Sequence, residues 1–376
     1  MNDASAGHES GTLRTVRPTV RPLLLAPLVL TALLLPSTAS AARPSDFLGI
    51  TSEDAFAGSD AYRDKAFADQ AAAGVRLVRQ PFNWSAIESV SGRYELGPYD
   101  RFVLAAARHR IRVMPILFDA PGFRERPATT GNPPPRSFRD MVSFAQVLWW
   151  RYGPRGTLWS QHPNVPMLPV RSWQVWNEPS LTKYWPPKPS PSQYGRMLRQ
   201  VGSILSAVDP KAEVVTAGIP ASRLSGAVPF ERYLNGLGRT ETPFDTLAVN
   251  AYARNVRDLM SNLRAARRML DRSGRKRTKI WVTELGWSDR GPRSRFRAGR
   301  RGQARLIESA FRALEKNRKR LKLRGVVYHS WMDGEPYAPR FKDFWGLHTG
   351  LLRLDGAPKP ALWVFQRTAK RLGWAR

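Results

Sequence analysis

Eight short apolar runs, each followed by a stretch with helical spacing, constrain the fold of this chain more than any other feature. Apolar runs that alternate with amphipathic helical patterns are typical of repeated βα units around a parallel sheet. The expected strands span residues 47–50, 75–79, 111–118, 172–176, 213–217, 246–252, 279–284 and 326–331. Eight such units predict a single (β/α)8 TIM barrel. An open doubly wound sheet is the rival fold, but no Gly-rich phosphate loop follows the first strand.

The clearest helix begins after Ser190, which can cap it, with Pro191 in the first position and Gln193 reaching back to the cap. Most of the longer irregular segments follow strands, at residues 119–136, 179–189, 285–301 and 332–347. Such loops build the C-terminal face of a barrel, where active sites lie. The loop 153–170 precedes a strand and is expected on the opposite face.

The first 41 residues read as a secretory signal peptide. Three arginines precede an apolar run over residues 23–35, and Ala39-Ser40-Ala41 follows as a cleavage site of small residues. The run is shorter than the roughly 20 residues of a membrane span. An uncleaved anchor is the alternative. Cleavage would leave residues 42–376 as one secreted or cell-envelope domain.

Composition excludes some chemistry and leaves the partner open. The chain has no cysteine, so disulfides and thiolate metal sites are impossible. Its formal net charge is +30, which favours polyanionic partners such as an acidic polysaccharide. The arginines are spread along most of the chain, so a solvated basic surface explains the charge equally well. The densest basic stretches are residues 272–277, 293–305 and 316–324. Only 293–305, which follows the seventh strand, could overhang the mouth and bind an acidic sugar.

Two glutamates have matched contexts at the ends of expected strands. Glu178 lies in Asn-Glu-Pro after the fourth strand, and Glu284 lies in Thr-Glu-Leu-Gly at the end of the seventh. In a barrel, both project into the C-terminal mouth from opposite sides. Cleavage of a glycosidic bond needs two carboxyl groups on either side of that bond. Either glutamate alone could be a solvated or capping carboxylate.

These two motifs resemble those of clan A glycoside hydrolases, which are retaining TIM-barrel enzymes with catalytic glutamates on strands four and seven. The expected second strand with Arg79, followed by Trp84, resembles the same clan. Trp185-Pro186-Pro187, then Tyr194 and Asp209-Pro210, resembles family 39, with family 5 as the close competitor. The likeness covers nearly the whole of residues 42–376.

The resemblance implies a role for each site residue. Glu178 would be the acid/base and Glu284 the nucleophile, with Arg79 and Tyr252 supporting the ionised nucleophile. Asn177 would donate to the sugar 2-hydroxyl. The mechanism requires no metal and no organic cofactor.

Further sugar contacts are expected from aromatic and polar side chains near the mouth. Trp331 would be the sugar platform, with Trp84, Tyr184 and Trp185 as weaker candidates and His329 as a further contact. Each could instead be a core residue. The chain departs from the clan near the end of the sixth strand. Members of the clan often have His-x-Tyr there, whereas this chain has Asn250-Ala251-Tyr252. Asn250 can hydrogen-bond but cannot titrate.

Other functions have weaker support. No histidines are spaced as a metal pair, and no serine-hydrolase elbow or Walker A loop occurs. The sequence therefore predicts a hydrolase that acts on a β-linked polysaccharide or oligosaccharide. The alternative is a protein that binds a cell-envelope polysaccharide or polyanion on the same scaffold without catalysis. Nucleic acid is not the expected partner, because no recognition module appears. The glycone, the linkage and the oligomeric state stay open.

Overall fold

The computed structural model describes residues 46–336 and 342–375, and Arg43–Arg376 form one compact unit. The signal peptide expected over residues 1–41 lies outside the described residues. Nine strands form one parallel sheet in the order β5-β4-β3-β2-β1-β9-β8-β7-β6. The strands are β1 Leu48–Thr51, β2 Leu77–Asn83, β3 Arg112–Phe118, β4 Ser172–Val175, β5 Glu213–Val215, β6 Ile219–Pro220, β7 Thr246–Asn250, β8 Lys279–Leu285 and β9 Leu323–His329.

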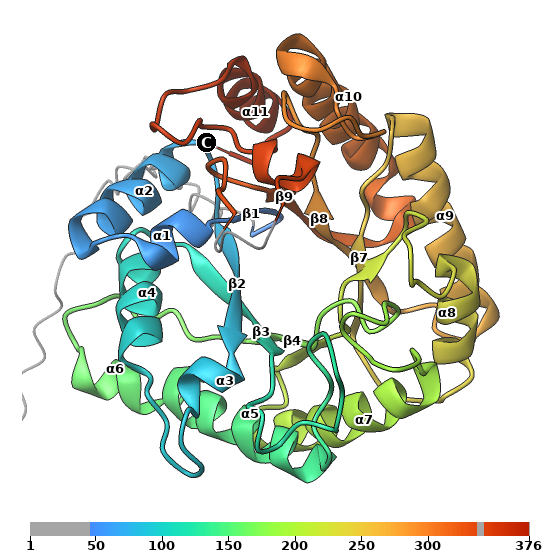
Figure 1. Cartoon of the computed structure of the whole chain (residues 1–376). Coiled ribbons are helices and arrows are strands. Elements are labelled where there is room, and N and C mark those ends of the chain that lie inside the picture. The colour runs from blue at the N-terminus through green and yellow to red at the C-terminus, as the bar shows by residue number, and fades with distance from the viewer. Residues whose placement is uncertain (1–45, 337–341, 376) are drawn as a thin grey trace, which may run out of the picture. The chain divides into compact units, whose positions relative to one another are not determined.

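A further pairing of Val215 in β5 with Thr246 in β7 closes the sheet into a barrel. β5 and the two-residue β6 follow one another along a single run, so the barrel has eight strand positions, as the sequence predicts. Helices surround it on the outside (Figure 1). They are α1 Glu53–Ala57, α2 Asp60–Ala72, α3 Trp84–Ile87, α4 Gly97–Arg108, α5 Phe138–Tyr152, α6 Thr157–Gln161, α7 Pro191–Val208, α8 Phe230–Gly238, α9 Val256–Arg272, α10 Gly299–Leu321 and α11 Pro360–Arg371, with a 3₁₀ turn at Trp345–His348.

The expected helix after Ser190 is α7. The Ser190 hydroxyl accepts from the backbone N–H of Gln193 at 3.3 Å, and Pro191 occupies the first turn. Gln193 does not reach back to the cap, because its side-chain oxygen accepts from the Arg126 guanidinium at 2.5 Å. The helix ends at Val208, one residue before Asp209-Pro210.

The barrel interior is filled at its lower end and open at its upper end. Leu77, Met114, Val215, Ala248, Trp281 and Val327 form a small inner cluster, separate from the large core between sheet and helices. Gly325 makes room for the Trp281 indole, because a Cβ at that position would lie 2.7 Å from its ring nitrogen. Below the indole, Arg324 pairs with Asp46 and Glu213. This packing leaves the C-terminal end for chemistry.

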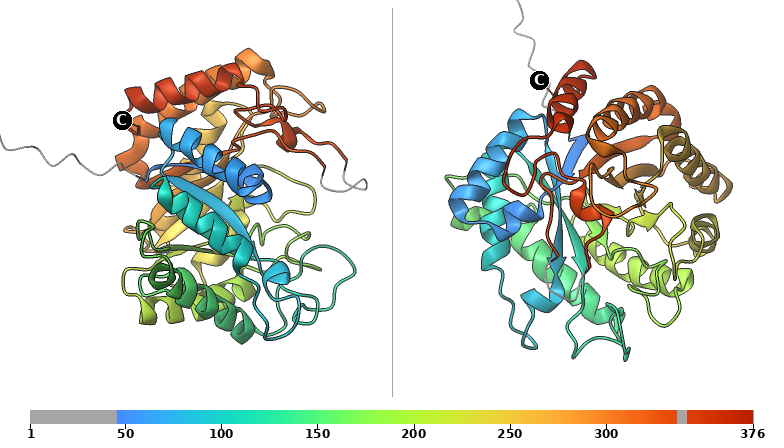
Figure 2. Two further views of the ribbon diagram at one scale, coloured as in Figure 1. Left: turned by 90° about the vertical axis from the view of Figure 1, so that its left-hand side faces the viewer. Right: turned by 45° about the horizontal axis from the view of Figure 1, so that its top comes forward.

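The long loops after the strands gather at that C-terminal end (Figure 2). A buried ion cluster ties two of them together. The Lys359 ammonium lies 2.7 Å from Asp289, which follows β8, and 2.7 Å from Asp333, which follows β9. All three side chains are buried, so each charge depends on the others for compensation. The cluster therefore fixes the loops beside the mouth.

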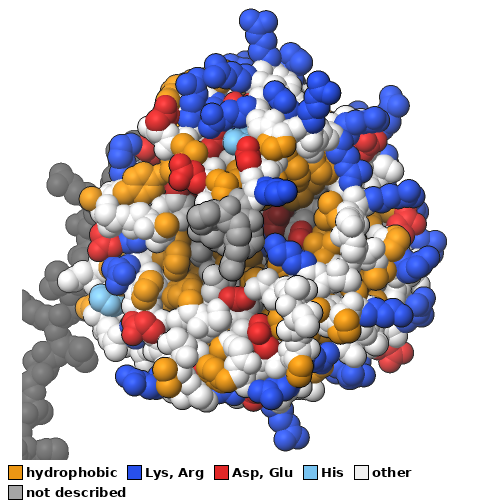
Figure 3. Space-filling view, viewed as in Figure 1, with side chains coloured by type: hydrophobic (Ala, Val, Ile, Leu, Met, Phe, Trp, Pro, Cys, Tyr) orange, Lys and Arg blue, Asp and Glu red, His pale blue; other side chains and the backbone are white. Residues whose placement is uncertain are grey.

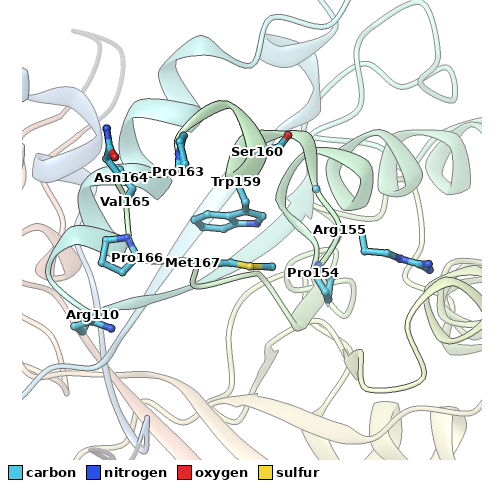
Figure 4. A pocket seen from close by; sticks show the side chains of 11 residues that line it. Arg110, Pro154, Arg155, Trp159, Ser160, Pro163, Asn164, Val165, Pro166 and Met167 are labelled. Atoms are coloured by element: carbon cyan, nitrogen blue, oxygen red, sulfur yellow. The ribbon is translucent and has the colours of Figure 1, made fainter.

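The largest cavity described lies at the opposite end of the barrel. It has a volume of about 740 Å³ and is lined mainly by residues 154–167, before β4, together with Arg110 before β3. Figure 4 shows the Trp159 ring beside Met167, with Arg110 and Arg155 farther out. The loop 153–170, which the sequence predicts on the lower face, therefore lies at that end of the barrel. None of the predicted site residues lines this cavity.

Candidate active site

Glu178 and Glu284 meet at the C-terminal mouth through one amide. The Asn250 Nδ2 donates to Glu178 Oε1 at 2.7 Å and to Glu284 Oε1 at 2.9 Å. Since one nitrogen contacts both oxygens, these oxygens are at most about 5.6 Å apart. Carboxyl groups about 5–5.5 Å apart are typical of retaining glycosidases, whereas inverting enzymes need about 6.5–9.5 Å. This bound applies to one oxygen of each carboxylate; it lies below the inverting range and includes the retaining range.

The orientation of Asn250 is set by its neighbours. The Thr283 hydroxyl donates to Asn250 Oδ1 at 2.9 Å, which turns the amide nitrogen toward the two carboxylates. Gly218 makes the space, because a Cβ there would lie 2.2 Å from Asn250 Oδ1. Asn250 itself is buried. The bridge is thus held from the side away from the mouth.

Arg79 connects three of the strands at the site. Its guanidinium lies 2.9 Å from Glu284 Oε1 as a buried ion pair, and it donates to Gln174 at 2.7 Å and to Asn177 Oδ1 at 3.2 Å. The Arg79 guanidinium thus places a positive charge against the Glu284 carboxylate. Because the Asn177 oxygen accepts from Arg79, the Asn177 amide nitrogen remains for another acceptor.

Glu178 sits in a strained turn directly after β4. Trp176 and Glu178 have φ angles of +72° and +44°, in the left-handed region that non-glycine residues rarely adopt. The Trp176 indole donates to the Tyr184 carbonyl at 2.9 Å, which holds the turn. Backbone strain of this kind persists only where the surroundings enforce it, and it clusters at functional sites.

Burial and a like charge make Glu178 the better proton carrier of the two. Burial raises its pKa well above the ordinary range, and the negative charge of Glu284 raises it further, while Asn250, Arg79 and Lys183 oppose the shift. Burial, the charge of Glu284 and a hydrogen bond to it also raise the pKa of Tyr252. Glu178 therefore favours its protonated form near neutrality.

Aromatic side chains border the glutamate pair on the side of the loops after β7, β8 and β9. The Tyr252 ring lies 4.8 Å from Trp345, 6.0 Å from Phe296 and 6.2 Å from His329, between ring centroids. The His329 Nδ1 is buried and has no hydrogen-bond partner among the described residues. A ligand hydroxyl could satisfy it. Figure 3 looks into this end and shows acidic side chains inside the hollow, with Lys and Arg at its edge.

The prediction that Trp84, Trp185 and Trp331 contact the sugar in the mouth is wrong. Trp84 and Trp185 have no exposed surface: Trp84 stacks on Phe144 of α5, and Trp185 packs edge-on against Trp176 and Tyr194. Trp331 is 2% exposed and lies after β9, facing α2 and α11. Tyr184 is partly buried against Phe118. These rings pack in the core or support loops.

Gln174, Thr283 and Trp345 take part in the site without having been predicted from the sequence. Gln174 could have been found from strand alternation, since it lies two residues before the end of the expected strand containing Trp176. Nothing in the sequence connects Trp345 to Tyr252, because a long irregular segment separates it from β9.

No metal site accompanies the pair. Within residues 46–336 and 342–375, no group of three or more His, Asp or Glu side chains could hold an ion. In the same residues, no helix has the length and apolarity that a membrane crossing needs.

The solved structures to which this chain is similar include several glycoside hydrolases. A monomeric β-xylosidase from Caulobacter crescentus aligns with a TM-score of 0.62 at 16% identity, over 86% of this chain and 67% of that one. A family 39 glycoside hydrolase from Bacteroides cellulosilyticus gives 0.60 at 17%, over 87% and 64%. Xylanase 10B from Thermotoga maritima gives 0.58 at 16%, over 87% and 95%.

The fold is the TIM barrel of these hydrolases. The family 39 chain from Bacteroides is longer, since this chain spans about two thirds of it. No protein-family model and no curated protein matches the sequence. Identities this low establish the fold alone, so the chemistry must be argued from the site.

Replacing Asn250 with alanine tests the bridge between the two carboxylates. We expect kcat/KM to fall about 10²-fold, because the glutamates lose the donor that holds them in register. Asn250→Asp should be worse, since a third carboxylate would repel both. Asn317→Ala, which removes a partly buried amide that donates to the Ala313 carbonyl within α10, is the matched control. Activity equal to the wild type in Asn250→Ala would contradict this role.

Proposed function

We propose that this chain is a retaining glycoside hydrolase that cleaves O-glycosidic bonds of a β-linked polysaccharide or oligosaccharide. The observation that carries the proposal is the Asn250 bridge, which contacts one oxygen of Glu178 and one of Glu284 and so brings the two carboxyl groups together at the mouth. The glycoside hydrolases with the same fold support the reaction class.

In the first step, Glu284 attacks the anomeric carbon while Glu178 gives its proton to the leaving oxygen. The glycosidic bond breaks, and a glycosyl ester forms on Glu284. Arg79 lies against the attacking carboxylate and Tyr252 beside it. Asn177, with its amide nitrogen turned away from Arg79, donates to the sugar 2-hydroxyl.

In the second step, the ionised Glu178 takes a proton from water, and the oxygen attacks the anomeric carbon. The ester bond to Glu284 breaks, which regenerates both carboxyl groups in their starting protonation states. Two inversions at one carbon give net retention. In both steps the transferred proton passes through Glu178, whose pKa in the free protein is raised by burial and by the charge of Glu284.

The alternative is a polysaccharide-binding protein that has the barrel but no catalysis. A panel of aryl β-glycosides and β-linked polysaccharides, incubated with the protein, separates the two. The hydrolase hypothesis predicts release of aryl alcohol or reducing ends from at least one substrate, with loss in Glu284→Ala. Retention on a polysaccharide column with no cleavage of any substrate would support the binding protein.

We propose further that the substrate is an acidic glycan. Arg295 follows β8 and covers the Phe296 ring at 5.1 Å, and Phe296 in turn packs on Tyr252. The Arg295 guanidinium also donates to the Arg223 carbonyl on the loop after β6. Arg295 is exposed and donates to a carbonyl rather than to a carboxylate, so its charge is available to a sugar carboxylate.

Arg295→Gln should therefore lower kcat/KM on a uronate-containing glycan about ten-fold and leave a neutral substrate within about two-fold. Arg320→Gln, at an exposed arginine near the end of α10, is the matched control. Equal losses on both substrates, or none on either, would argue against an acidic substrate.

We also propose that the protein is secreted, because residues 1–41 have the pattern of a signal peptide. N-terminal sequencing of the exported protein should begin at Ala42. A start at Met1 would favour the anchor.

A further inference from the structure

A second pocket lies on the outer wall of the barrel, between α2 and α11. Its volume is about 430 Å³, within the range of small-molecule sites. We call it the α2–α11 pocket. Its lining residues come from three segments: Tyr62, Lys65, Ala66, Asp69 and Ala72 of α2, Leu362, Trp363 and Gln366 of α11, and Trp331, Leu352, Asp355, Gly356 and Pro358 between β9 and α11. The two helices are neighbours in the outer ring (Figures 1 and 2).

The pocket runs along the outer wall, from Trp363 near the C-terminal end of the barrel to Ala72 at the end of α2. Trp331 is the second residue after β9, and Trp363 lies in the first turn of α11, which begins at the C-terminal end of the barrel. Met332, next to Trp331, pairs with Leu352 in an isolated bridge.

Trp363 is the exposed wall of the pocket. Its side chain is 56% exposed, whereas Trp331, which closes the inner wall, is 2% exposed. Single exposed apolar side chains are ordinary on protein surfaces, so what distinguishes Trp363 is that its ring borders a concave surface, the setting in which ligand sites occur. Leu362 and Gln366 line the pocket from the same side of α11, so the helix presents a formed surface.

The polar groups of the pocket suit a neutral polyhydroxylated ligand. Lys65 and Asp69 neutralise each other at 2.6 Å, and the Tyr62 hydroxyl is engaged with Asp54 at 2.8 Å. The remaining charge is the Asp355 carboxylate, in a chain whose net charge is +30. An acidic polymer gains nothing at such a site. An indole face for sugar C–H groups, with a carboxylate and an amide for hydroxyls, fits a neutral saccharide.

We infer that the α2–α11 pocket is a second carbohydrate-binding site, which holds an uncharged stretch of a β-glycan outside the catalytic mouth. The inference rests on the proposed function for the class of ligand, a β-glycan, and assigns to this pocket uncharged residues of a polymer whose acidic residues lie near Arg295. It assigns Trp363 as the sugar platform of this site. Trp331, expected from the sequence as a platform in the mouth, supports the pocket from behind.

The test is electrophoresis of the full chain in native gels that contain β-1,4-xylan, β-1,4-mannan or mixed-linkage β-glucan, with Glu284→Ala as the background to prevent cleavage. We expect at least one polymer to retard the protein. Trp363→Ala should weaken that retardation at least about five-fold in apparent Kd, and Trp363→Phe should recover part of it. Trp150→Ala is the matched control, because Trp150 on α5 is 53% exposed and lines none of the pockets described.

Equal retardation of Trp363→Ala and Trp150→Ala, or no retardation by any of the three polymers, would overturn the inference. Hydrolysis is measured separately, on an aryl β-glycoside too short to reach the pocket. Trp363→Ala with an otherwise wild-type site should hydrolyse it within about two-fold of the parent. Absence of hydrolysis in every protein, with Trp363-dependent retardation intact, would refute the proposed function and leave the second site standing.

Discussion

Glu284→Ala should lose turnover by roughly 10⁴-fold or more in kcat, the largest effect that we expect from any single substitution. Glu284 is the only carboxylate among the described residues that is paired with Arg79 and bridged by Asn250 to a second carboxyl group. Without it, no group can form the glycosyl ester. The measurement is initial rates on the best substrate of the panel.

Azide distinguishes loss of the nucleophile from general damage. The cavity left by Glu284→Ala admits azide, which attacks the anomeric carbon from the same face and should give a glycosyl azide of inverted configuration. Glu335→Ala, at an exposed glutamate on the loop after β9, is the control and should keep full activity. Failure of azide to restore any turnover, with the protein folded, would count against the assignment.

Glu178→Ala should lower kcat/KM about 10²–10⁴-fold on substrates with poor leaving groups. The loss should shrink for a dinitrophenyl glycoside, because that leaving group departs without a proton. Azide should then speed breakdown of the glycosyl ester and give a product of retained configuration. A loss that is the same for good and poor leaving groups would contradict the acid/base role.

The pH profile follows from the same residue. The protonated form of Glu178 is the active acid, and burial and the charge of Glu284 raise its pKa. A raised pKa keeps the proton on at higher pH, so the alkaline limb of kcat/KM should lie above the ordinary glutamate range. That limb should disappear in Glu178→Ala when a dinitrophenyl glycoside is the substrate. An alkaline limb that is unchanged in this variant would belong to another group.

Much of the barrel could be predicted because its strands are buried on both faces and read as apolar runs. The expected strand over residues 172–176 differs from β4 by one residue, and that over 279–284 differs from β8 by one. The fifth run was expected as one strand, and the structure divides it into β5 and β6. Strand ends are set by tertiary pairing, which the local sequence does not contain.

The tryptophans could not be assigned from the sequence, because a tryptophan that binds sugar and one that packs in the core have similar neighbours along the chain. Trp331 was placed at the end of a strand over residues 326–331, facing the same way as His329. The strand ends at His329, so the alternation does not continue. His329 lies beside Tyr252, while Trp331 lies against α2 and α11.

For Asn250, the sequence predicted a contact in the site correctly but not the form of that contact. Its position in Asn250-Ala251-Tyr252 marked it as a polar contact, but the sequence could not show that its amide lies between both glutamates. That arrangement depends on Thr283 from β8 and on the space at Gly218 before β6. Contacts between separate strands arise only when the barrel closes.

The most direct test of the account is to trap the covalent intermediate. The full chain is incubated with a 2-deoxy-2-fluoro β-glycoside that carries a good leaving group, matched to the best panel substrate, and is then digested and examined by mass spectrometry. The account predicts one added glycosyl unit, on the peptide that contains Glu284, and no label in Glu284→Ala. A label on any other residue, or hydrolysis of the parent glycoside to a product of inverted configuration, would contradict it.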